Sequence, residues 1–277
     1  MNMKKLILCA LAALCILPLN AKSEREVAIV AHRGYWACEQ GGNSHNSIAA
    51  LKAAQDLDFW GSEFDVNMTK DGELFVFHDD QVAGMKFCEH NAAEFAAVRL
   101  PNGEKIPTLD EYLSQFERDK SCRLVFELKW HKDLATQLEA VDKSIEKLKA
   151  HGLYDPKQVI FISFDLQECL LFADRCPGFT VQYLGSEDSR NPAFLASLGI
   201  NGIDTNYWKF IKDPSWYTQA RRNGMSVNVW TIDEKEQMRN MIKLGADYIT
   251  TNKPELCREL LEEMGIKELK AGKNFRK

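Results

Sequence analysis

Carboxylate and histidine side chains fall at short spacings in the first third of the chain. Glu63 and Asp65 lie two residues apart in the apolar run GSEFDVNMT, and His78 ends a second run, ELFVFHD. The four residues TKDG at 69–72 separate the two runs. Four residues are too few for a parallel crossover, and Asp-Gly between alternating runs is a strong hairpin signal. We therefore expect the two runs to form antiparallel strands.

A turn centred on Asp71-Gly72 would place Asp65 opposite His78 and Glu63 opposite Asp80. Opposed residues share a face of the sheet, as do residues two apart on one strand. The face so formed would hold Glu63, Asp65, Asn67, His78 and Asp80. Crowded carboxylates repel one another unless a cation neutralises them, and oxygen ligands suit Mg²⁺ or Ca²⁺. The pattern indicates a metal site, and a solvated acidic face is the alternative.

Two further strand ends carry reactive side chains. His32 and Arg33 precede Gly34 at the end of the first apolar run, and Glu127 and Lys129 end the run RLVFELKW. Histidine transfers protons near neutral pH, and arginine makes paired contacts to phosphate. A carboxylate and an ammonium two residues apart share a side, which favours a third metal ligand beside a phosphate contact. A structural histidine and an ion pair within the strand are the alternatives.

Strand-like runs alternate with helical patterns along almost the whole chain, which predicts a parallel sheet with crossover helices. Eight such units close into a (β/α)8 TIM-type barrel, with a local hairpin at the second and third runs. The active-site loops of this fold follow the carboxyl ends of the strands. The predicted runs are 27–34, 61–69, 73–79, 123–130, 159–164, 180–185, 202–208, 226–232 and 247–251.

Residues 1–21 have two lysines, an apolar run and a small residue, the pattern of a cleaved signal peptide. We expect export to the periplasm or the medium, with residues 22–277 as one barrel domain. The stretch 80–107 lacks periodicity and is interpreted as a short insertion over the barrel mouth. The basic C-terminal end, KELKAGKNFRK, is expected to fray.

The composition is that of an ordinary globular protein, with 45% hydrophobic and 27% charged residues. The net charge of -5 argues against a nucleic-acid partner, since such proteins present basic surfaces. No later run is long and apolar enough for a membrane span. We expect a small-molecule partner.

Several motifs together resemble those of glycerophosphodiester phosphodiesterases. HRG at 32–34 and ExD at 63–65 occur in the order and spacing typical of that family. The same holds for TxDG at 69–72, HD at 78–79 and ELK at 127–129. The closing segments VNVWTID and LGADYITTNKPE are also similar, so the resemblance covers nearly the whole mature chain.

The resemblance implies a metal-dependent hydrolase of glycerophosphodiesters and assigns roles to eight residues. Glu63, Asp65 and Glu127 would bind a divalent cation, Mg²⁺ or Ca²⁺. His32 and His78 would be the general acid and base. Arg33 and Lys129 would contact the phosphate, and Trp230 would pack on the glycerol side of the substrate.

The chain departs from the family pattern in two places. A PENT-like segment is replaced by SHNS at 44–47, which puts His45 where the family has an acidic residue. We expect His45 to cap the following helix region rather than to support the site. The late TDxP motif reads TNKP, so Asn252 replaces another carboxylate.

Other interpretations stay open. A related phosphodiesterase would release a cyclic phosphate. A barrel glycosidase would use Glu127 and Asp204 and no metal. A non-catalytic phosphate-binding protein would use the same barrel. Six cysteines follow the leader, and Cys38 and Cys88 could meet as a disulfide over the mouth or remain separate thiols.

Overall fold

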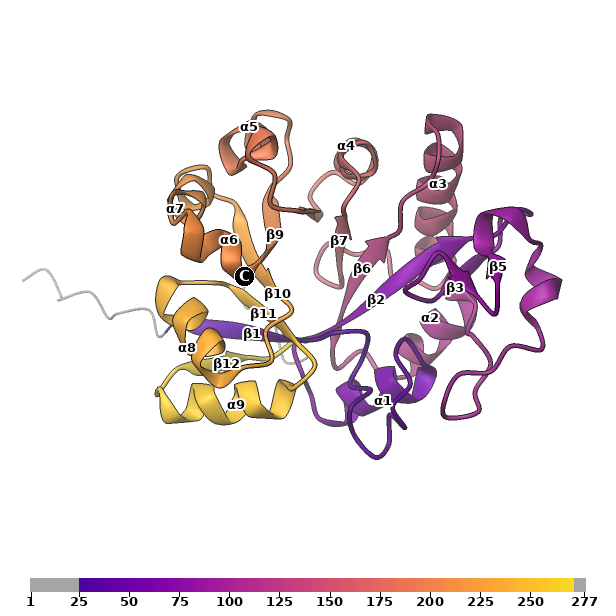
Figure 1. The fold of residues 1–277 in the computed structure, drawn as a ribbon, viewed down its shortest axis with the longest axis horizontal. Helices are drawn as coiled ribbons and strands as arrows, with labels where there is room; N and C mark the ends of the chain where they lie inside the picture. Colours follow the sequence, from indigo (N-terminus) through magenta and orange to yellow (C-terminus); the bar gives the residue numbers. More distant parts are fainter. Residues whose placement is uncertain (1–24, 272–277) are drawn as a thin grey trace, which may run out of the picture.

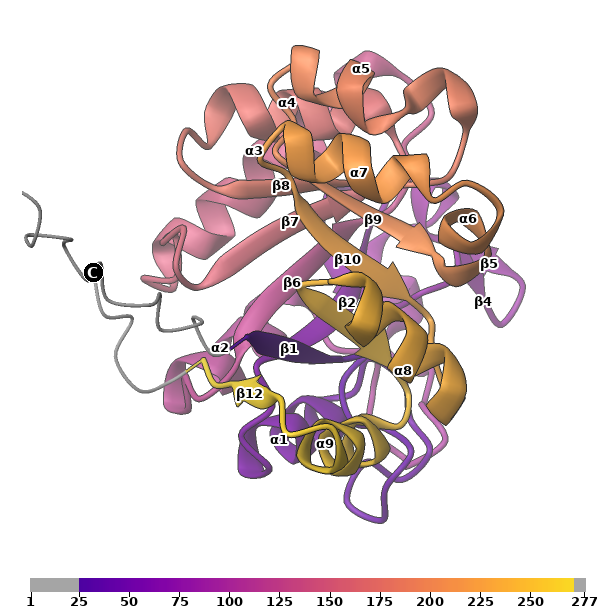
Figure 2. The same cartoon turned by 90° about the vertical axis from the view of Figure 1, so that its left-hand side faces the viewer.

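Eight parallel strands close into a barrel, as predicted. The structure is a computed structural model and describes residues 25–271 (Figures 1 and 2). Each strand is parallel to the next, and the first pairs with both the second and the last, which closes the ring. The barrel strands are β1 (Glu26–Ala31), β2 (Gly61–Met68), β6 (Arg123–Leu128), β7 (Val159–Ser163), β8 (Thr180–Leu184), β9 (Gly202–Asn206), β10 (Ser226–Trp230) and β11 (Tyr248–Thr251).

Most of these strands end one to three residues earlier than the corresponding predicted apolar run. The predicted run 27–34, for example, overlaps β1, which stops at Ala31 and leaves His32 in a turn. Likewise β6 stops at Leu128, one residue before Lys129. The residues with reactive side chains therefore lie at or just beyond the strand ends, where this fold forms its active sites.

Helices surround the barrel, as Figures 1 and 2 show. Side chains on their termini explain where several begin: Ser47 accepts a hydrogen bond from Ala50 N, and Thr108 forms a capping box with Glu111. The helices are α1 (Ile48–Asp56), α2 (Leu109–Arg118), α3 (Leu134–Ala150), α4 (Leu166–Arg175), α5 (Pro192–Ser197), α6 (Tyr207–Lys212), α7 (Ser215–Arg222), α8 (Lys235–Leu244) and α9 (Pro254–Glu263).

Alternation along the strands separates two groups of buried side chains. Outward-facing aromatic residues pack under the helices; Phe126, for example, contacts Phe64 and Phe161 at ring-centroid distances of 5.1 and 5.8 Å. A smaller apolar cluster includes Val30 and Ile160 and fills the barrel interior. The outer core fixes the strands that carry the site.

The hairpin forms as predicted, but its register differs by one residue. Strand β3 (Leu74–Val76) runs antiparallel to β2, with Val66 opposite Val76. Three residues rather than two form the turn, because Thr69 N donates to Glu73 O and Gly72 sits at a φ of +82°. The predicted pairs of Asp65 with His78 and Glu63 with Asp80 are therefore wrong. Strand β3 ends before His78.

The segment 80–107 builds a small core of its own beside β3 (Figure 1). Phe87 and Phe95 stack at 4.6 Å between ring centroids, and Phe75 of β3 contacts both. A hydrogen bond from Lys70 N to Phe87 O joins the segment to the hairpin turn. Its elements are β4 (Gln81–Val82), β5 (Met85–Lys86) and the 3-10 helices η1 (Phe87–Glu89) and η2 (Ala92–Phe95); a third, η3 (Asp188–Arg190), precedes α5.

The structure corrects the expectation about the C-terminal end and decides between the two alternatives for the cysteines. Part of the tail does not fray, because β12 (Lys267–Leu269) pairs in parallel with β1. The six cysteines between residues 25 and 271 are all free thiols. Of the two alternatives for Cys38 and Cys88, the structure has the separate thiols: Cys38 Sγ donates to Tyr35 O, and Cys88 is exposed. The predicted signal peptide lies outside the described residues.

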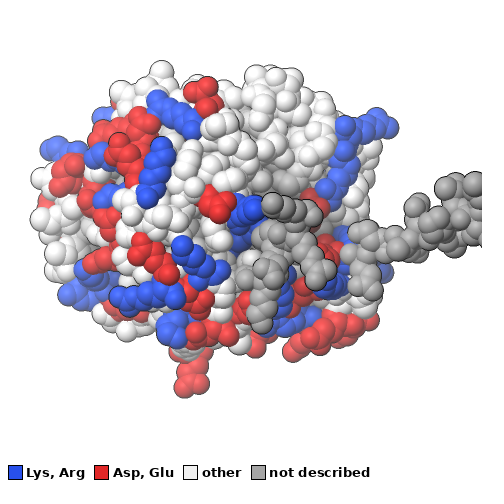
Figure 3. All heavy atoms as spheres, turned by 180° about the vertical axis from the view of Figure 1, so that it is seen from behind, with Lys and Arg blue, Asp and Glu red and all other residues white. Residues whose placement is uncertain are grey.

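The surface carries charges of both signs. On the face seen in Figure 3, lysine and arginine side chains are interspersed with aspartate and glutamate instead of forming one basic patch. Within residues 25–271, no helix has the length and apolar character needed to cross a membrane.

Candidate active site

A pocket opens at the carboxyl ends of the barrel strands and contains most of the predicted site. Acidic, basic and aromatic side chains line it together. The lining residues are His32, Arg33, Glu63, His78, Glu127, Ile162, Phe164, Leu184, Asp204, Trp230, Thr231 and Thr250.

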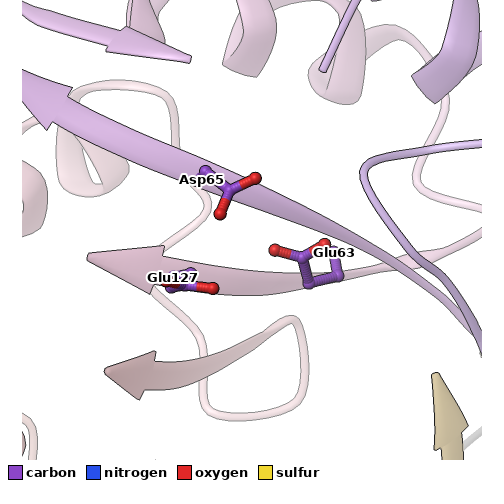
Figure 4. A group of neighbouring side chains, drawn as sticks. All are labelled: Glu63, Asp65 and Glu127. Carbon is purple, nitrogen blue, oxygen red and sulfur yellow. The ribbon is translucent and has the colours of Figure 1, made fainter. Parts of the chain in front are cut away.

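Three carboxylates converge at this pocket. Glu63 and Asp65 point from β2 into the barrel, and Asp65 is in register with Glu127 of β6. One oxygen of each lies within 4.8 Å of the others, and Figure 4 shows the three facing one another. All three are buried, with exposed fractions of 3%, 1% and 7%. The predicted metal ligands are therefore brought together.

The electrostatics of this cluster fit a bound cation. Burial, followed by repulsion from Asp65 and Glu127, raises the pKa of Glu63 well above its ordinary value. Burial and Asp65 raise the pKa of Glu127 to about 8. Glu63 Oε1 is buried without a hydrogen-bond partner. A divalent cation would neutralise the charges and give this oxygen a partner, and the oxygen-only ligand set suits a hard ion.

A chain of hydrogen bonds fixes the ring of His32. Its Nδ1 lies 2.9 Å from Asn252 Oδ1, while Asn252 Nδ2 donates to Asp233 Oδ2 at 2.8 Å. Because the amide oxygen only accepts, the neutral ring carries its proton on Nδ1. Nε2, which lies 4.0 Å from Glu63 Oε2, keeps its lone pair. Burial and the charge of Arg33 lower the pKa of His32 to about 4, so it is neutral near pH 7.

Arg33 is held in a strained backbone conformation beside the carboxylates. Its φ is +59°, its N–H donates to Glu63 Oε2 at 2.8 Å, and its Nε lies 3.7 Å from Asp65 Oδ2. Gly34 follows at a φ of +76°, and a Cβ there would lie 2.7 Å from the Ala50 carbonyl carbon. The HRG turn therefore requires glycine. Arg33 Nε has no hydrogen-bond partner and can bind an anion.

His78 reaches the pocket from just beyond β3, despite the shifted hairpin register. Phe77 N donates to Asp65 O at 2.9 Å, which holds the strand end against β2. The side chain of His78 is 38% exposed, and its Nδ1 lies 2.6 Å from Asp79 Oδ1. Asp80 is exposed and does not join the buried carboxylates.

Lys129 lies directly over the carboxylates. Its backbone N–H donates to Val66 O, and its Nζ lies 2.7 Å from Glu127 Oε1 and 3.3 Å from Asp65 Oδ1. Burial alone would lower the pKa of Lys129, but the two carboxylates more than offset it, so the pKa is raised. The ammonium is therefore charged beside the buried carboxylates, although Lys129 is not among the residues that line the pocket.

Aromatic side chains form the other wall of the pocket. Trp230, at the end of β10, meets Phe164 edge to face at 5.5 Å between ring centroids. Ile162 and Leu184 complete this apolar side. Trp230 thus lies where an aromatic residue can cover the carbon skeleton of a substrate.

One site residue was not predicted, and it lies in the SHNS segment that departs from the family pattern. Asn46 Nδ2 donates to Asp65 Oδ2 at 2.8 Å, and Asn46 Oδ1 accepts from Asp65 N at 3.2 Å. Asn46 therefore orients a predicted metal ligand. We expected His45 to cap the helix, and it does not. Ser47 is the N-cap, and exposed His45 contacts the Trp36 ring. The paired-amide role had no distinct sequence signal.

Known proteins are similar to this chain in both sequence and fold. The profile of the Glycerophosphoryl diester phosphodiesterase family matches residues 32–256. A glycerophosphodiester phosphodiesterase of Caldanaerobacter subterraneus is 30% identical over 249 residues, covering 86% of this chain and 98% of that protein.

Solved structures give the same result. A glycerophosphodiester phosphodiesterase from Parabacteroides distasonis has a TM-score of 0.83 at 36% identity, covering 87% of this chain and 99% of that one. A phosphodiesterase of Oleispira antarctica, solved with the product sn-glycerol-3-phosphate, has a TM-score of 0.71 at 22% identity, covering 85% and 96%. At 22% identity, the similarity to the Oleispira antarctica structure is evidence for the fold alone.

Proposed function

Because this chain belongs to the glycerophosphoryl diester phosphodiesterase family, we propose that it hydrolyses glycerophosphodiesters to glycerol 3-phosphate and an alcohol. It is a phosphoric diester hydrolase. The observation that carries the substrate proposal is one pocket that joins two histidines, Arg33 and buried carboxylates. A phosphodiester is anionic, so its hydrolysis needs charge neutralisation and two proton transfers.

The buried carboxylates supply the metal site. Glu63, Asp65 and Glu127 would hold one divalent cation, Mg²⁺ or Ca²⁺. When bound, such a cation offsets negative charge on the phosphate oxygens. Arg33 and Lys129 add two positive charges from the protein itself, and Arg33 Nε, which makes no hydrogen bond, can donate one to a phosphate oxygen.

The two histidines carry the protons. His32 is neutral with Nε2 unprotonated, so it is suited to take a proton from the attacking hydroxyl. His78 then gives a proton to the leaving alcohol from the exposed side of the pocket. The attacking group is water or the glycerol 2-hydroxyl, the second by way of a cyclic phosphate that water then opens.

We also propose that the protein is exported from the cytoplasm. Support comes from residues 1–21, whose lysines, apolar run and small residue are typical of a cleaved leader. Fractionation of cells expressing the full chain and a chain lacking 2–21 tests it. Equal cytoplasmic retention of both would contradict export.

The activity is tested on the purified mature protein with a panel of glycerophosphodiesters. Glycerol 3-phosphate release is followed with Mg²⁺, Ca²⁺ or Mn²⁺ added after EDTA treatment. We expect release that depends on the cation and is abolished by Asp65→Ala. Release of a stable cyclic phosphate, seen by ³¹P NMR, would assign a lyase reaction instead, and full activity in EDTA would remove the metal proposal.

A further inference from the structure

One buried acid in the pocket has no part in the proton or phosphate chemistry described above. Asp204 points from β9 into the barrel and lines the pocket beside Trp230 and Thr250. Its exposed fraction is 1%. Asp204 Oδ2 accepts a hydrogen bond from Asn228 Nδ2 at 3.0 Å, but Oδ1 is buried with no partner. Such an atom is costly to leave unpaired.

The protein itself cannot easily satisfy this oxygen. Asn228 is committed on its other side, where its Oδ1 accepts from Thr250 Oγ1 at 3.0 Å and from Val229 N at 2.8 Å. These bonds orient the Asn228 amide and tie β9, β10 and β11 together. Rotating the Asp204 carboxyl would only exchange its two oxygens. The unpaired atom therefore stays at the pocket wall, available to a ligand.

Asp204 is distinct from the metal cluster. The three carboxylates that lie within 4.8 Å of one another do not include it. Burial, then the charge of Glu127, raises the pKa of Asp204 well above its ordinary value, which favours a neutral carboxyl group. A neutral carboxyl can donate as well as accept a hydrogen bond. The unpaired Oδ1 at the pocket wall can accept a hydrogen bond from a hydroxyl, whereas another anion has no proton to give it.

We propose that Asp204 hydrogen-bonds a hydroxyl group of the polyol part of the substrate and so selects phosphodiesters that carry a small polyol. This inference rests on the proposed function and names the protein group that recognises the glycerol side. Ile162, Leu184 and Trp230 line the same pocket with apolar surface for the carbon skeleton. A site built around a substrate hydroxyl rejects analogues that lack it, because its polar atom is then left unpaired.

The test compares two variants on two substrates. Asp204→Leu removes the hydrogen bond at similar size, and Asp204→Asn keeps a donor at that position. The substrates are glycerophosphocholine and bis(p-nitrophenyl) phosphate, which lacks a polyol. We expect Asp204→Leu to lower kcat/KM about 10- to 100-fold for glycerophosphocholine, mostly through KM, and less than about threefold for the synthetic diester. Asp204→Asn should stay within about fivefold of wild type on both.

Equal losses on the two substrates would overturn the inference, as would an Asp204→Asn variant that is as weak as Asp204→Leu on glycerophosphocholine. If circular dichroism shows that Asp204→Leu does not fold, the inference is tested instead by the substrate preference of the wild-type enzyme. It should prefer glycerophosphocholine at least about tenfold over the analogue lacking the terminal hydroxyl, and Asp204→Asn should keep that preference. Equal rates on both would overturn the inference. Wild-type turnover of the synthetic diester alone would instead contradict the proposed function.

Discussion

His32 and Asn252 form a hydrogen bond of 2.9 Å between Nδ1 and Oδ1, and Asp233 holds the amide from behind. Trp36 Nε1 donates to the same Asn252 oxygen at 3.0 Å. The amide is thus fixed in one orientation by three partners. It sets the tautomer of His32 without adding a charge beside the ring.

Asn252→Ala should lower kcat by about tenfold or more while leaving cation affinity unchanged. The reason is that His32 loses the acceptor that places its proton on Nδ1, so the wrong tautomer and ring orientations become populated. Activity and ¹⁵N chemical shifts of the His32 ring are the measurements. Asn252→Asp is the matched variant, since it keeps an acceptor but sets a second carboxylate against Asp233. An unchanged tautomer in Asn252→Ala would show that the amide does not position the ring.

His32→Ala and His78→Ala should each reduce kcat by about 10²-fold or more, the usual contribution of general acid–base catalysis. Their circular dichroism should match wild type, because both side chains lie beyond the strand ends. His90→Ala provides the control and should retain most activity, since the His90 ring meets Lys86 O and Phe95 outside the pocket. Near-normal turnover in either of the first two variants would remove that residue from the mechanism.

The barrel itself was predictable because strand and helix periods alternate along the chain, and each predicted strand run overlaps an observed strand. Two of the three converging carboxylates were predictable for a local reason: Glu63 and Asp65 are two apart on one strand, so they share a face in any register. Glu127 was predicted from its place at the end of a strand run, where this fold gathers its active-site residues, on the same side as Lys129.

Other contacts depend on details that short-range patterns do not contain. One additional turn residue moved His78 off the strand ladder, yet the chain still brought it to the pocket. Asn46 and Asn252 join segments far apart in sequence, and their roles depend on which amide atom faces which partner. The free state of Cys38 follows from a turn in which its thiol bonds locally.

Metal-free protein should lose stability as pH rises. The pKa of Glu127 is raised from 4.5 to about 8 in the folded chain, so between these values the folded state binds more protons than the unfolded state. The free energy of unfolding then falls with pH, by at most about 1.4 kcal/mol per unit for each such group. The raised pKa values of Glu63 and Asp204 act in the same direction, while the pKa of His32, lowered from 6.5 to about 4, opposes them below pH 6.5, so the fall is steepest above that pH.

Urea unfolding in EDTA from pH 5 to 8 measures this slope. Glu127→Gln should make the slope shallower, because the amide does not titrate while Glu63 and Asp204 still do. Saturating Mg²⁺ or Ca²⁺ should also flatten it, since a cation that binds only the folded state replaces the protons. Stability that rises with pH in EDTA would contradict the buried carboxylates as its source.

Gly34→Ala should destabilise the fold by about 2–5 kcal/mol and reduce activity. The substitution combines a positive φ of +76° with a Cβ placed 2.7 Å from both the carbonyl carbon and the Cβ of Ala50 in α1. Relief requires the HRG turn to move, which displaces His32 and Arg33. Gly84→Ala is the matched control: its φ is +79°, but nothing lies within 4 Å of the added Cβ. It should cost only about 1–2 kcal/mol and leave kcat unchanged. Equal losses of stability in the two variants, measured by urea unfolding, would mean that the contact with α1 does not constrain the turn.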